Sequence, residues 1–260
     1  MSHISYSEFK EWVNCPWKHK LVYLDKVKQF NGNEHTAFGT ALHTVCEHMV
    51  YEKILDYKAL FEAEFVKNLQ EIKAKDSNFK FNPELISGMR EQGQYITDFI
   101  LPALKSYFGV FEIVEVEEKL YEDIEDEEKK FKGFIDLVVK TKDDKHHIVD
   151  WKTCGWGWDT RKKSDKMITY QLTLYKHFWC KKHNVAPNSV QTHFALLKRT
   201  AKRDNVEIFK VTSGAKKTEN ALKLLHKSLY NINRKNYVKN KLACHGRYGV
   251  CEFYKSEYCQ

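Results

Sequence analysis

Two hydrophobic periods divide the chain, and the first of them is helical. Up to residue 108 apolar side chains recur every three or four positions, which predicts amphipathic helices. The expected helices are a short one opened by the Ser5-x-x-Glu8 capping box and ending near Cys15-Pro16, a second from Trp17 to about Leu24, then 36–52, 57–73, and a long one from Asn82-Pro83 toward Phe108. The N-terminal part is therefore expected to be mainly helical.

After Gly109 the hydrophobic period changes to two. Three consecutive strands are expected near 113–116, 131–139 and 147–152, separated by polar turns. A helix over 166–182, strands over 190–198 and 206–211, and a helix over 215–236 complete the pattern. This order predicts an α/β fold, in which a mixed central β-sheet is flanked by helices.

Neither an internal repeat nor a Gly/Ser linker marks a boundary between domains. We therefore expect a single domain over 1–260, divided into a helical part (1–108), a sheet core (109–212) and a C-terminal helix with a cysteine-rich tail (213–260).

Composition narrows the class of protein further. The 260 residues include 42% hydrophobic side chains, enough for a large core, so disorder is excluded. The start of the chain has no basic and apolar leader, and no long apolar run is present, so we expect a cytoplasmic protein, bacterial or phage-encoded, without membrane association. A formal charge of +8 permits a polyanionic partner, although many basic proteins only have a solvated Lys-rich surface.

Two carboxylates and a lysine form the first candidate site. Asp150 and Lys152 are two residues apart on an expected strand, so both side chains leave the same face of the sheet. A tight hairpin would bring Asp136, on the preceding strand, beside Asp150. Carboxylates that share a site repel each other unless a divalent cation lies between them, and hard oxygen ligands favour Mg²⁺ or Mn²⁺.

An isolated Asp-x-Lys is usually a surface ion pair. Here apolar residues surround both carboxylates, Ile148 and Val149 before Asp150 and the segment 134–138 around Asp136. Charges on buried strands need a partner. The sequence therefore favours a metal site, with Lys152 placed to hold a phosphate oxygen or orient a water.

Four motifs that follow one another along the chain support the prediction of a metal site. Gly39-Thr-Ala-Leu-His43, Gly133-Phe-Ile-Asp136, Asp150-Trp-Lys152 and Gln171-Leu-Thr-Leu-Tyr175 follow one another along the chain. Together they resemble the PD-(D/E)xK nuclease superfamily, specifically its RecB-like exonuclease branch, which includes nuclease domains of recombination helicase-nucleases and CRISPR-adaptation nucleases. The resemblance covers Ser5 to Cys259 and implies a restriction-endonuclease-like core.

The resemblance also assigns roles. It implies that Asp136, Asp150, the backbone carbonyl of Trp151 and the imidazole of His43 hold the metal and that Lys152 is the catalytic lysine. An imidazole ligand shifts preference toward Mn²⁺. The alternative for His43 is a helix-face histidine packed against the sheet.

Other residues fit the resemblance less firmly. Gln171 and Tyr175 lie four apart on one helix face and would hold DNA or orient the site, unless Tyr175 is simply core. Relatives often carry a glutamate near the metal on the strand before Asp136. Glu118 is the first choice for it, but Glu115 and Glu117 leave the alignment open.

Four cysteines suggest a second site. Cys244, Cys251 and Cys259 lie within the last sixteen residues, and with the remote Cys15 they can form a Cys₄ site that joins the two ends of the chain. The resemblance implies a structural [4Fe–4S] cluster. The spacing is looser than the tightest form of that pattern, so structural Zn²⁺ stays an alternative.

A loop with two tryptophans follows the Asp150 strand. Trp156 and Trp158 lie among basic residues between 154 and 166, a composition suited to holding single-stranded nucleic acid. One of the two indoles could instead pack beneath the loop.

Together these features predict a metal-dependent DNase, a single-strand exonuclease in recombination, repair or phage DNA processing, with DNA ends as substrate and a helicase or recombination protein as a possible partner. A non-catalytic DNA-binding or scaffold protein, or an endonuclease or RNA-processing enzyme, is the alternative.

Overall fold

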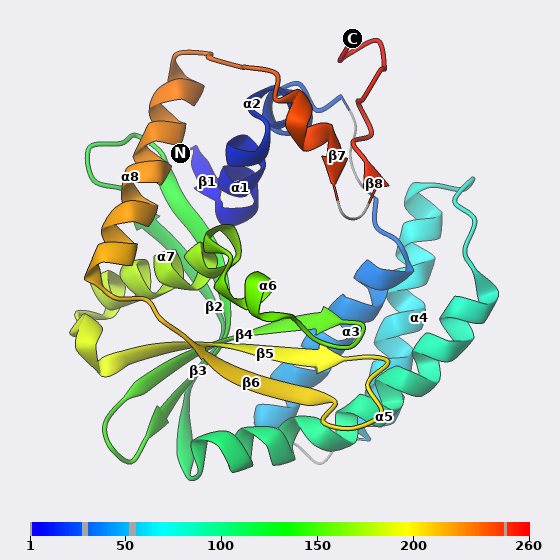
Figure 1. Cartoon of the computed structure of the whole chain (residues 1–260). Helices are drawn as coiled ribbons and strands as arrows, with labels where there is room; N and C mark the ends of the chain where they lie inside the picture. Colours follow the sequence, from blue (N-terminus) through cyan, green and yellow to red (C-terminus); the bar gives the residue numbers. More distant parts are fainter. Residues whose placement is uncertain (1, 28–30, 52–55, 247–248) are drawn as a thin grey trace. The chain divides into compact units, whose positions relative to one another are not determined.

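The computed structural model describes residues 2–27, 31–51, 56–246 and 249–260. Its main sheet has six strands: β1 (His3–Ser5), β2 (Phe111–Asp123), β3 (Lys130–Thr141), β4 (His146–Cys154), β5 (Val190–Lys198) and β6 (Val206–Val211). They lie in the order β1-β3-β4-β5-β6, with β2 also paired with β3 (Figure 1). The β1–β3 and β4–β5 pairs are parallel, whereas β3–β4 and β5–β6 are antiparallel. The predicted mixed α/β fold is confirmed.

The chain divides into two compact units. A terminal unit comprises Met1–Phe30, Leu120–Gly133 and Gly214–Gln260, and a core unit comprises Asn31–Lys119 and Phe134–Ser213. Within the described ranges we find no helix whose length and hydropathy would let it cross a bilayer.

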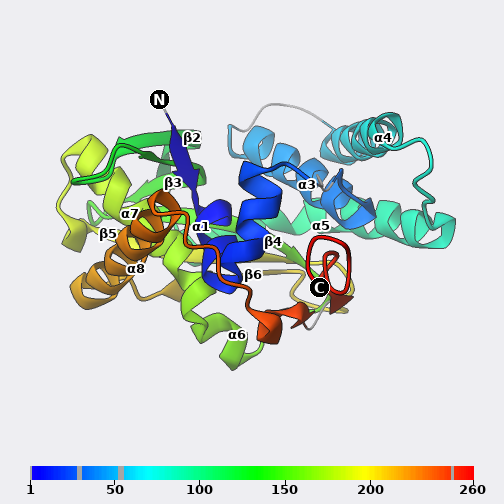
Figure 2. The same ribbon diagram turned by 90° about the horizontal axis from the view of Figure 1, so that it is seen from above.

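One face of the sheet in the core unit packs against α3 (Glu34–Val50) and α5 (Pro83–Phe108), and α4 (Tyr57–Lys75) packs on these two helices. The three helices lie side by side in both views (Figures 1 and 2). Odd-numbered residues of β3, β4 and β5 point toward them, because side chains alternate along a strand. These are Leu137, Val139, Val149, Trp151, Ala195 and Leu197, all within one apolar core. At Gly93 a Cβ would lie 2.0 Å from the Phe61 ring, so only glycine lets α5 approach α4 this closely.

The even-numbered residues of β4 face the opposite side, where helix α7 (Lys166–His183) packs. The His146 ring lies 5.2 Å from the Trp179 ring of α7, centroid to centroid. Asp150 and Lys152 have the same parity as His146, so they too leave the α7 face.

The terminal unit joins the two ends of the chain. It contains α1 (Tyr6–Asn14), α2 (Pro16–His19), the π-helix η1 (Lys20–Leu24), α8 (Ala215–Asn233), and the short strands β7 (His245–Gly246) and β8 (Gly249–Val250). The Trp17 indole donates to the carbonyl of Tyr258 (2.8 Å), and the Asn240 amide donates to the carbonyl of Asn14 (2.9 Å). These bonds hold the C-terminal tail against the first helices.

Most predicted elements are present, with differences at their ends. Ser5 caps α1 by accepting from the Glu8 N–H, but the Glu8 carboxylate contacts His19 (3.1 Å). The predicted end of α3 at Glu52 lies outside the described residues. The sequence analysis missed β1 and the single helical turn α6 (Thr160–Ser164), both too short for a clear hydrophobic period.

Two histidines form a hydrogen-bonded chain inside the core unit. His193 Nδ1 lies 3.3 Å from the Tyr107 hydroxyl, and its Nε2 lies 3.0 Å from Nδ1 of His147. Nε2 of His147 lies 2.9 Å from the Thr141 hydroxyl. Burial, followed by the neighbouring His147 and Lys210, lowers the pKa of His193 to about 3. Burial also lowers the pKa of His147.

These shifts predict loss of stability in acid. A histidine whose pKa is lower in the folded than in the unfolded state stabilises the fold fully above its unfolded value and progressively less as the pH falls below it. For His193 this amounts to about 2 kcal/mol of unfolding free energy lost by pH ~5. Urea unfolding between pH 5 and 7.5 measures it. His193→Gln should reduce the slope, whereas the exposed His35→Gln should not, and equal slopes for both would contradict the assignment.

Candidate active site

The site begins where β3 and β4 stop pairing. The last pair in their register is Leu137 with Val149, and Asp136 comes next on β3. The Trp151 N–H donates to Asp136 Oδ2 over 2.7 Å within the buried interior. The buried Asp136 carboxylate therefore accepts the hydrogen bond that a backbone carbonyl of the neighbouring strand would accept in a regular sheet.

Asp150 and Lys152 lie together on β4, as their spacing predicted. Lys152 Nζ is 2.5 Å from Asp150 Oδ2, and the Asp150 side chain is 2% exposed. The ammonium also lies 5.8 Å from the centre of the Phe194 ring. Asp150 is thus almost fully buried, and the lysine that pairs with it has a flexible, partly exposed side chain.

His43 reaches the site from α3. Its Nδ1 lies 3.7 Å from Asp136 Oδ2. Gly39, one turn earlier on the same helix face, allows this approach, since a Cβ there would lie 3.3 Å from the Thr153 hydroxyl on β4. The small size of Gly39 therefore helps α3 to pack closely against β4 beside His43.

Glu117 completes a group of three possible ligands. The ligand atoms of His43, Glu117 and Asp136 all lie within 4.8 Å of one another, and no other such group of three occurs among the described residues. Glu117 has a φ of 51°, a left-handed conformation that non-glycine residues rarely adopt. The bend at this position directs its carboxylate toward α3.

Glu118, the residue that the sequence analysis preferred, lies elsewhere. Its carboxylate accepts from the Trp179 indole (2.6 Å), from Lys182 (2.8 Å) and from His183 (2.5 Å) on α7. The choice of Glu118 over Glu117 was therefore wrong for the metal group. Glu118 instead fixes the strand next to Glu117.

The sequence-based ligand set overlaps this group only in part. His43 and Asp136 belong to it, whereas Asp150 pairs with Lys152, and the contact that Trp151 makes with Asp136 uses its N–H. Asp150 is nevertheless within electrostatic range of Asp136 and His43.

Burial and like charge raise the pKa of several carboxyl groups here. Burial, then the charges of Asp136 and Glu47, raises the pKa of Glu117 to about 7. Burial, partly offset by Lys152 and reinforced by Asp136, raises the pKa of Asp150 to about 6. For His43, burial opposes protonation, but the Asp136 carboxylate outweighs it and the pKa rises.

This arrangement fits a divalent cation. An imidazole and two carboxylates form a donor set suited to Mg²⁺ or Mn²⁺, and a positive ion would relieve the repulsion that raises these pKa values. An open hollow of about 390 Å³ adjoins the group. Its lining includes Thr40, Thr44 and Glu47 of α3 as well as His43 and Glu117. There is room beside the ligands for a substrate group.

Helix α7 contributes a second layer. Gln171 Nε2 donates to the Tyr175 hydroxyl over 3.2 Å, as expected for residues one turn apart. Tyr175 is 6% exposed. Its pKa lies well above the usual range because of burial and then the charge of Asp150. The tyrosine thus combines a core position with a polar end that lies near Asp150.

The two tryptophans of the following loop differ. Trp156 is 78% exposed, whereas Trp158 packs edge-on to Phe194 (5.2 Å between centroids) and Phe209 (6.2 Å). Lys162 lies over the Trp158 ring. Of these two tryptophans, Trp156 has the ring that is exposed enough to stack on a base.

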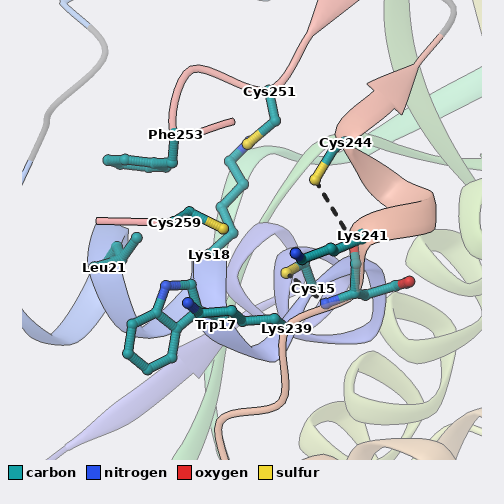
Figure 3. Close-up of a pocket in the computed structure, with 11 residues that line it drawn as sticks. Cys15, Trp17, Lys18, Leu21, Lys239, Lys241, Cys244, Cys251, Phe253 and Cys259 are labelled. Carbon is teal, nitrogen blue, oxygen red and sulfur yellow. Dashed lines mark hydrogen bonds between the residues drawn. The ribbon is translucent and has the colours of Figure 1, made fainter. Parts of the chain in front are cut away.

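The four predicted cysteines meet in the terminal unit. Cys15, Cys244, Cys251 and Cys259 line one small hollow, and their sulfurs point toward it (Figure 3). Lys18, Lys239 and Lys241 surround the same hollow. The other three cysteines contribute, after burial, to a raised pKa of Cys244. The chain therefore brings together thiols that are up to 244 positions apart in the sequence.

Comparison with known proteins identifies the family. A model of the PD-(D/E)XK nuclease superfamily matches residues 3–260. The chain belongs to this superfamily. No curated protein matches it. In this family divalent metals are the usual cofactors, in agreement with the group around Asp136.

One solved structure agrees with this fold. A protein from Eubacterium rectale, described as a candidate exonuclease, is 12% identical with a TM-score of 0.56, over 98% of this chain and 86% of that one. At this identity the likeness shows the fold alone. A second structure, SSO0001, is 13% identical over 73% of this chain and 84% of that one, and its TM-score of 0.35 carries no argument.

Glu117 provides a test of the metal group in this nuclease-family chain. We expect Glu117→Gln to weaken Mn²⁺ binding by at least about tenfold, because one of three close donors loses its charge. Binding should also release protons and strengthen as the pH rises through about 7, the pKa of Glu117. Calorimetry in buffers of different ionisation enthalpy measures both effects. Glu115→Gln, an equal charge change on the same strand, is the control, and identical affinities in the two variants would refute the role of Glu117.

Proposed function

We propose that the protein is a metal-dependent deoxyribonuclease of the RecB-like branch that degrades single-stranded DNA from its ends. The observation that carries the proposal is the convergence of His43, Glu117 and Asp136 next to the Asp150–Lys152 pair. The family match supports hydrolysis of nucleic acid, and the ordered motifs support the branch.

The proposed reaction is hydrolysis of a phosphodiester. Water adds to the phosphorus, one P–O ester bond breaks, and the departing oxygen takes up a proton. His43, Glu117 and Asp136 would hold Mg²⁺ or Mn²⁺, with Asp150 as a further carboxylate close by. A divalent cation supplies Lewis-acid charge for the phosphate and promotes ionisation of water.

The remaining site residues act on charge and position. Lys152, which is partly exposed, can leave Asp150 to stabilise the negative charge that develops on the phosphate oxygens. Asp150, whose pKa is about 6, can hold or accept a proton near neutral pH. Tyr175, tied to Gln171, lies near Asp150 and can orient it or the DNA backbone.

Single-stranded DNA fits the surface beside Lys152. Trp156 follows Lys152 by four residues and is exposed, and the segment 160–164 after it carries three basic residues. Stacking on aromatic faces combined with cations that follow phosphates is how proteins bind single strands without reading sequence.

A [4Fe–4S] cluster is the proposed occupant of the cysteine site, with a structural role. The gathering of four thiols around one hollow supports a site that binds an iron–sulfur cluster, with structural Zn²⁺ as the alternative. Joined to Cys15, the tail would be fixed to the first helices.

Digestion of end-labelled DNA tests the nuclease proposal. We expect linear single strands to be degraded in Mn²⁺ or Mg²⁺ and not in chelator. Lys152→Ala should lower the rate by about 100-fold or more, because the positive charge that stabilises the phosphate is lost. Asp150→Asn should lower it by about 100-fold or more, because the carboxylate that can accept a proton beside the metal is lost. Asp144→Asn, the same change in the exposed turn of this hairpin, should leave the rate unaltered.

The substrate panel separates the alternatives. Equal cleavage of circular single strands would show an endonuclease, and preference for RNA an RNA-processing enzyme. DNA binding without cleavage in any metal would leave a scaffold protein. If Asp150→Asn and Asp144→Asn cleave equally fast, the reaction does not take place at this site.

The purified protein tests the cluster. We expect a brown protein, purified without air, that contains iron and acid-labile sulfide. Cys259→Ser should lose most of both and expose the tail to protease, whereas Cys180→Ser, a buried cysteine of α7, should retain them. A colourless wild-type protein with one zinc ion per chain would exclude the cluster.

A further inference from the structure

The core unit contains another hollow, separate from the metal group. It measures about 450 Å³ and lies between α5 and the segment 199–205 that connects β5 to β6. Its lining includes Glu91, Gln92, Tyr95, Arg199, Thr200 and Asn205. We call it the α5 pocket.

Arg199 is the charged group best placed to bind a ligand there. It is half-buried, and burial lowers its pKa. Its Nη1 donates to Gln92 Oε1 over 2.8 Å, which fixes the guanidinium in the pocket. Over the described ranges no carboxylate lies within ion-pair distance of Arg199. A partly desolvated guanidinium held without an anion suits a phosphate, to which arginine can donate two parallel hydrogen bonds.

The wall of the pocket is tied to the strand that carries Lys152. The Arg199 N–H donates to the carbonyl of Cys154, and the Thr200 N–H donates to the carbonyl of Gly155, both over 2.8 Å. Asn205 closes the segment by donating to the carbonyls of Lys198 (3.0 Å) and Ala201 (3.1 Å). The pocket is therefore built in advance rather than formed by a loose loop.

These bonds also relate the pocket to the exposed Trp156, since Gly155 precedes it directly. β4 and β5 run parallel here, with Cys154 paired to Lys198. Lys152 precedes Gly155 by three residues on the same segment. The pocket therefore lies just beyond the ends of β4 and β5, on the side of the sheet that α5 covers.

The remaining lining suits one nucleotide. Tyr95 is 51% exposed, and its ring packs at a tilt of 59° against the Phe99 ring (4.9 Å between centroids), which supports it from one side. Glu91 is the carboxylate of the lining and would oppose a second phosphate. One arginine, one aromatic ring and one acid match a single base with its phosphate better than a run of phosphates or a duplex.

We propose that the α5 pocket binds one unpaired nucleotide of the substrate strand, beyond the nucleotides that flank the cleaved bond. Arg199 holds the phosphate and Tyr95 stacks on the base. This subsite rests on the proposed nuclease function and adds a reason for its preference for single strands, since a paired base cannot turn onto Tyr95.

Fluorescence anisotropy of labelled oligo-dT, from two to about twelve nucleotides in length, tests the subsite. Ca²⁺ is present to neutralise the carboxylates, and each length is measured at several salt concentrations. Affinity should rise in a step once the strand is long enough to reach the pocket. Arg199→Gln should weaken binding of the longer strands about fivefold and reduce the salt slope by about 0.7, the contribution of one phosphate contact.

Tyr95→Ala should cost about tenfold in affinity for the same strands and Tyr95→Phe less than about twofold, because the phenyl ring still stacks. Arg90→Gln is the matched control. This change also removes one positive charge. The Arg90 guanidinium extends from α5 and pairs with Glu62 of α4, so binding should stay within about twofold of wild type.

If Arg199→Gln and Tyr95→Ala both bind like Arg90→Gln at every length, the subsite does not exist. Should Arg199→Gln fail to fold, Tyr95→Ala decides, since its ring is exposed. Cleavage by the wild type is scored separately. If the wild type cleaves DNA but the variants bind it as tightly as the wild type does, the pocket proposal is refuted and the nuclease proposal stands. If the wild type binds longer strands more tightly but cleaves none, the nuclease proposal is refuted and the pocket proposal stands.

Discussion

The hydrogen bond from the Trp151 N–H to Asp136 Oδ2 is the contact on which the site depends. The Trp151 side chain is buried among the helices of one face, so its backbone is held firmly. Asp136, next to the last pair of the hairpin, is thereby fixed where β3 and β4 separate. His43, Glu117 and the Asp150–Lys152 pair are all arranged around this one carboxylate.

Concentrating carboxylates in this way opposes folding in the absence of metal. Burial and mutual repulsion raise the pKa of Glu47, Glu117 and Asp150, so part of the cluster holds protons near neutral pH. A divalent cation would displace those protons and convert repulsion into ligation. The same electrostatics that are unfavourable in the metal-free site would therefore favour binding of a doubly charged ion.

Much of the architecture could be predicted because it follows from periodicity. The change from helical to strand spacing after Gly109 placed the sheet, and a spacing of two placed Asp150 and Lys152 on one face. The Cys residues converged as their clustering near the C terminus suggested. Glu117 could not be chosen over Glu118 in this way. Its left-handed φ interrupts the alternation of β2, and a glutamate gives no sign of such a bend, whereas glycine or asparagine would.

The same limit applies to surfaces made by segments distant in sequence. Arg199 and Tyr95 are 104 positions apart, and no pattern in the sequence links them. They line one pocket because α5 packs against β6 and Arg199 Nη1 donates to Gln92 Oε1. Strand ends that run parallel bring their following loops to one edge of a sheet. Lys152 and Trp156 lie near the end of β4 and just after it, and Arg199 directly follows β5, so two segments distant in sequence end at the same edge.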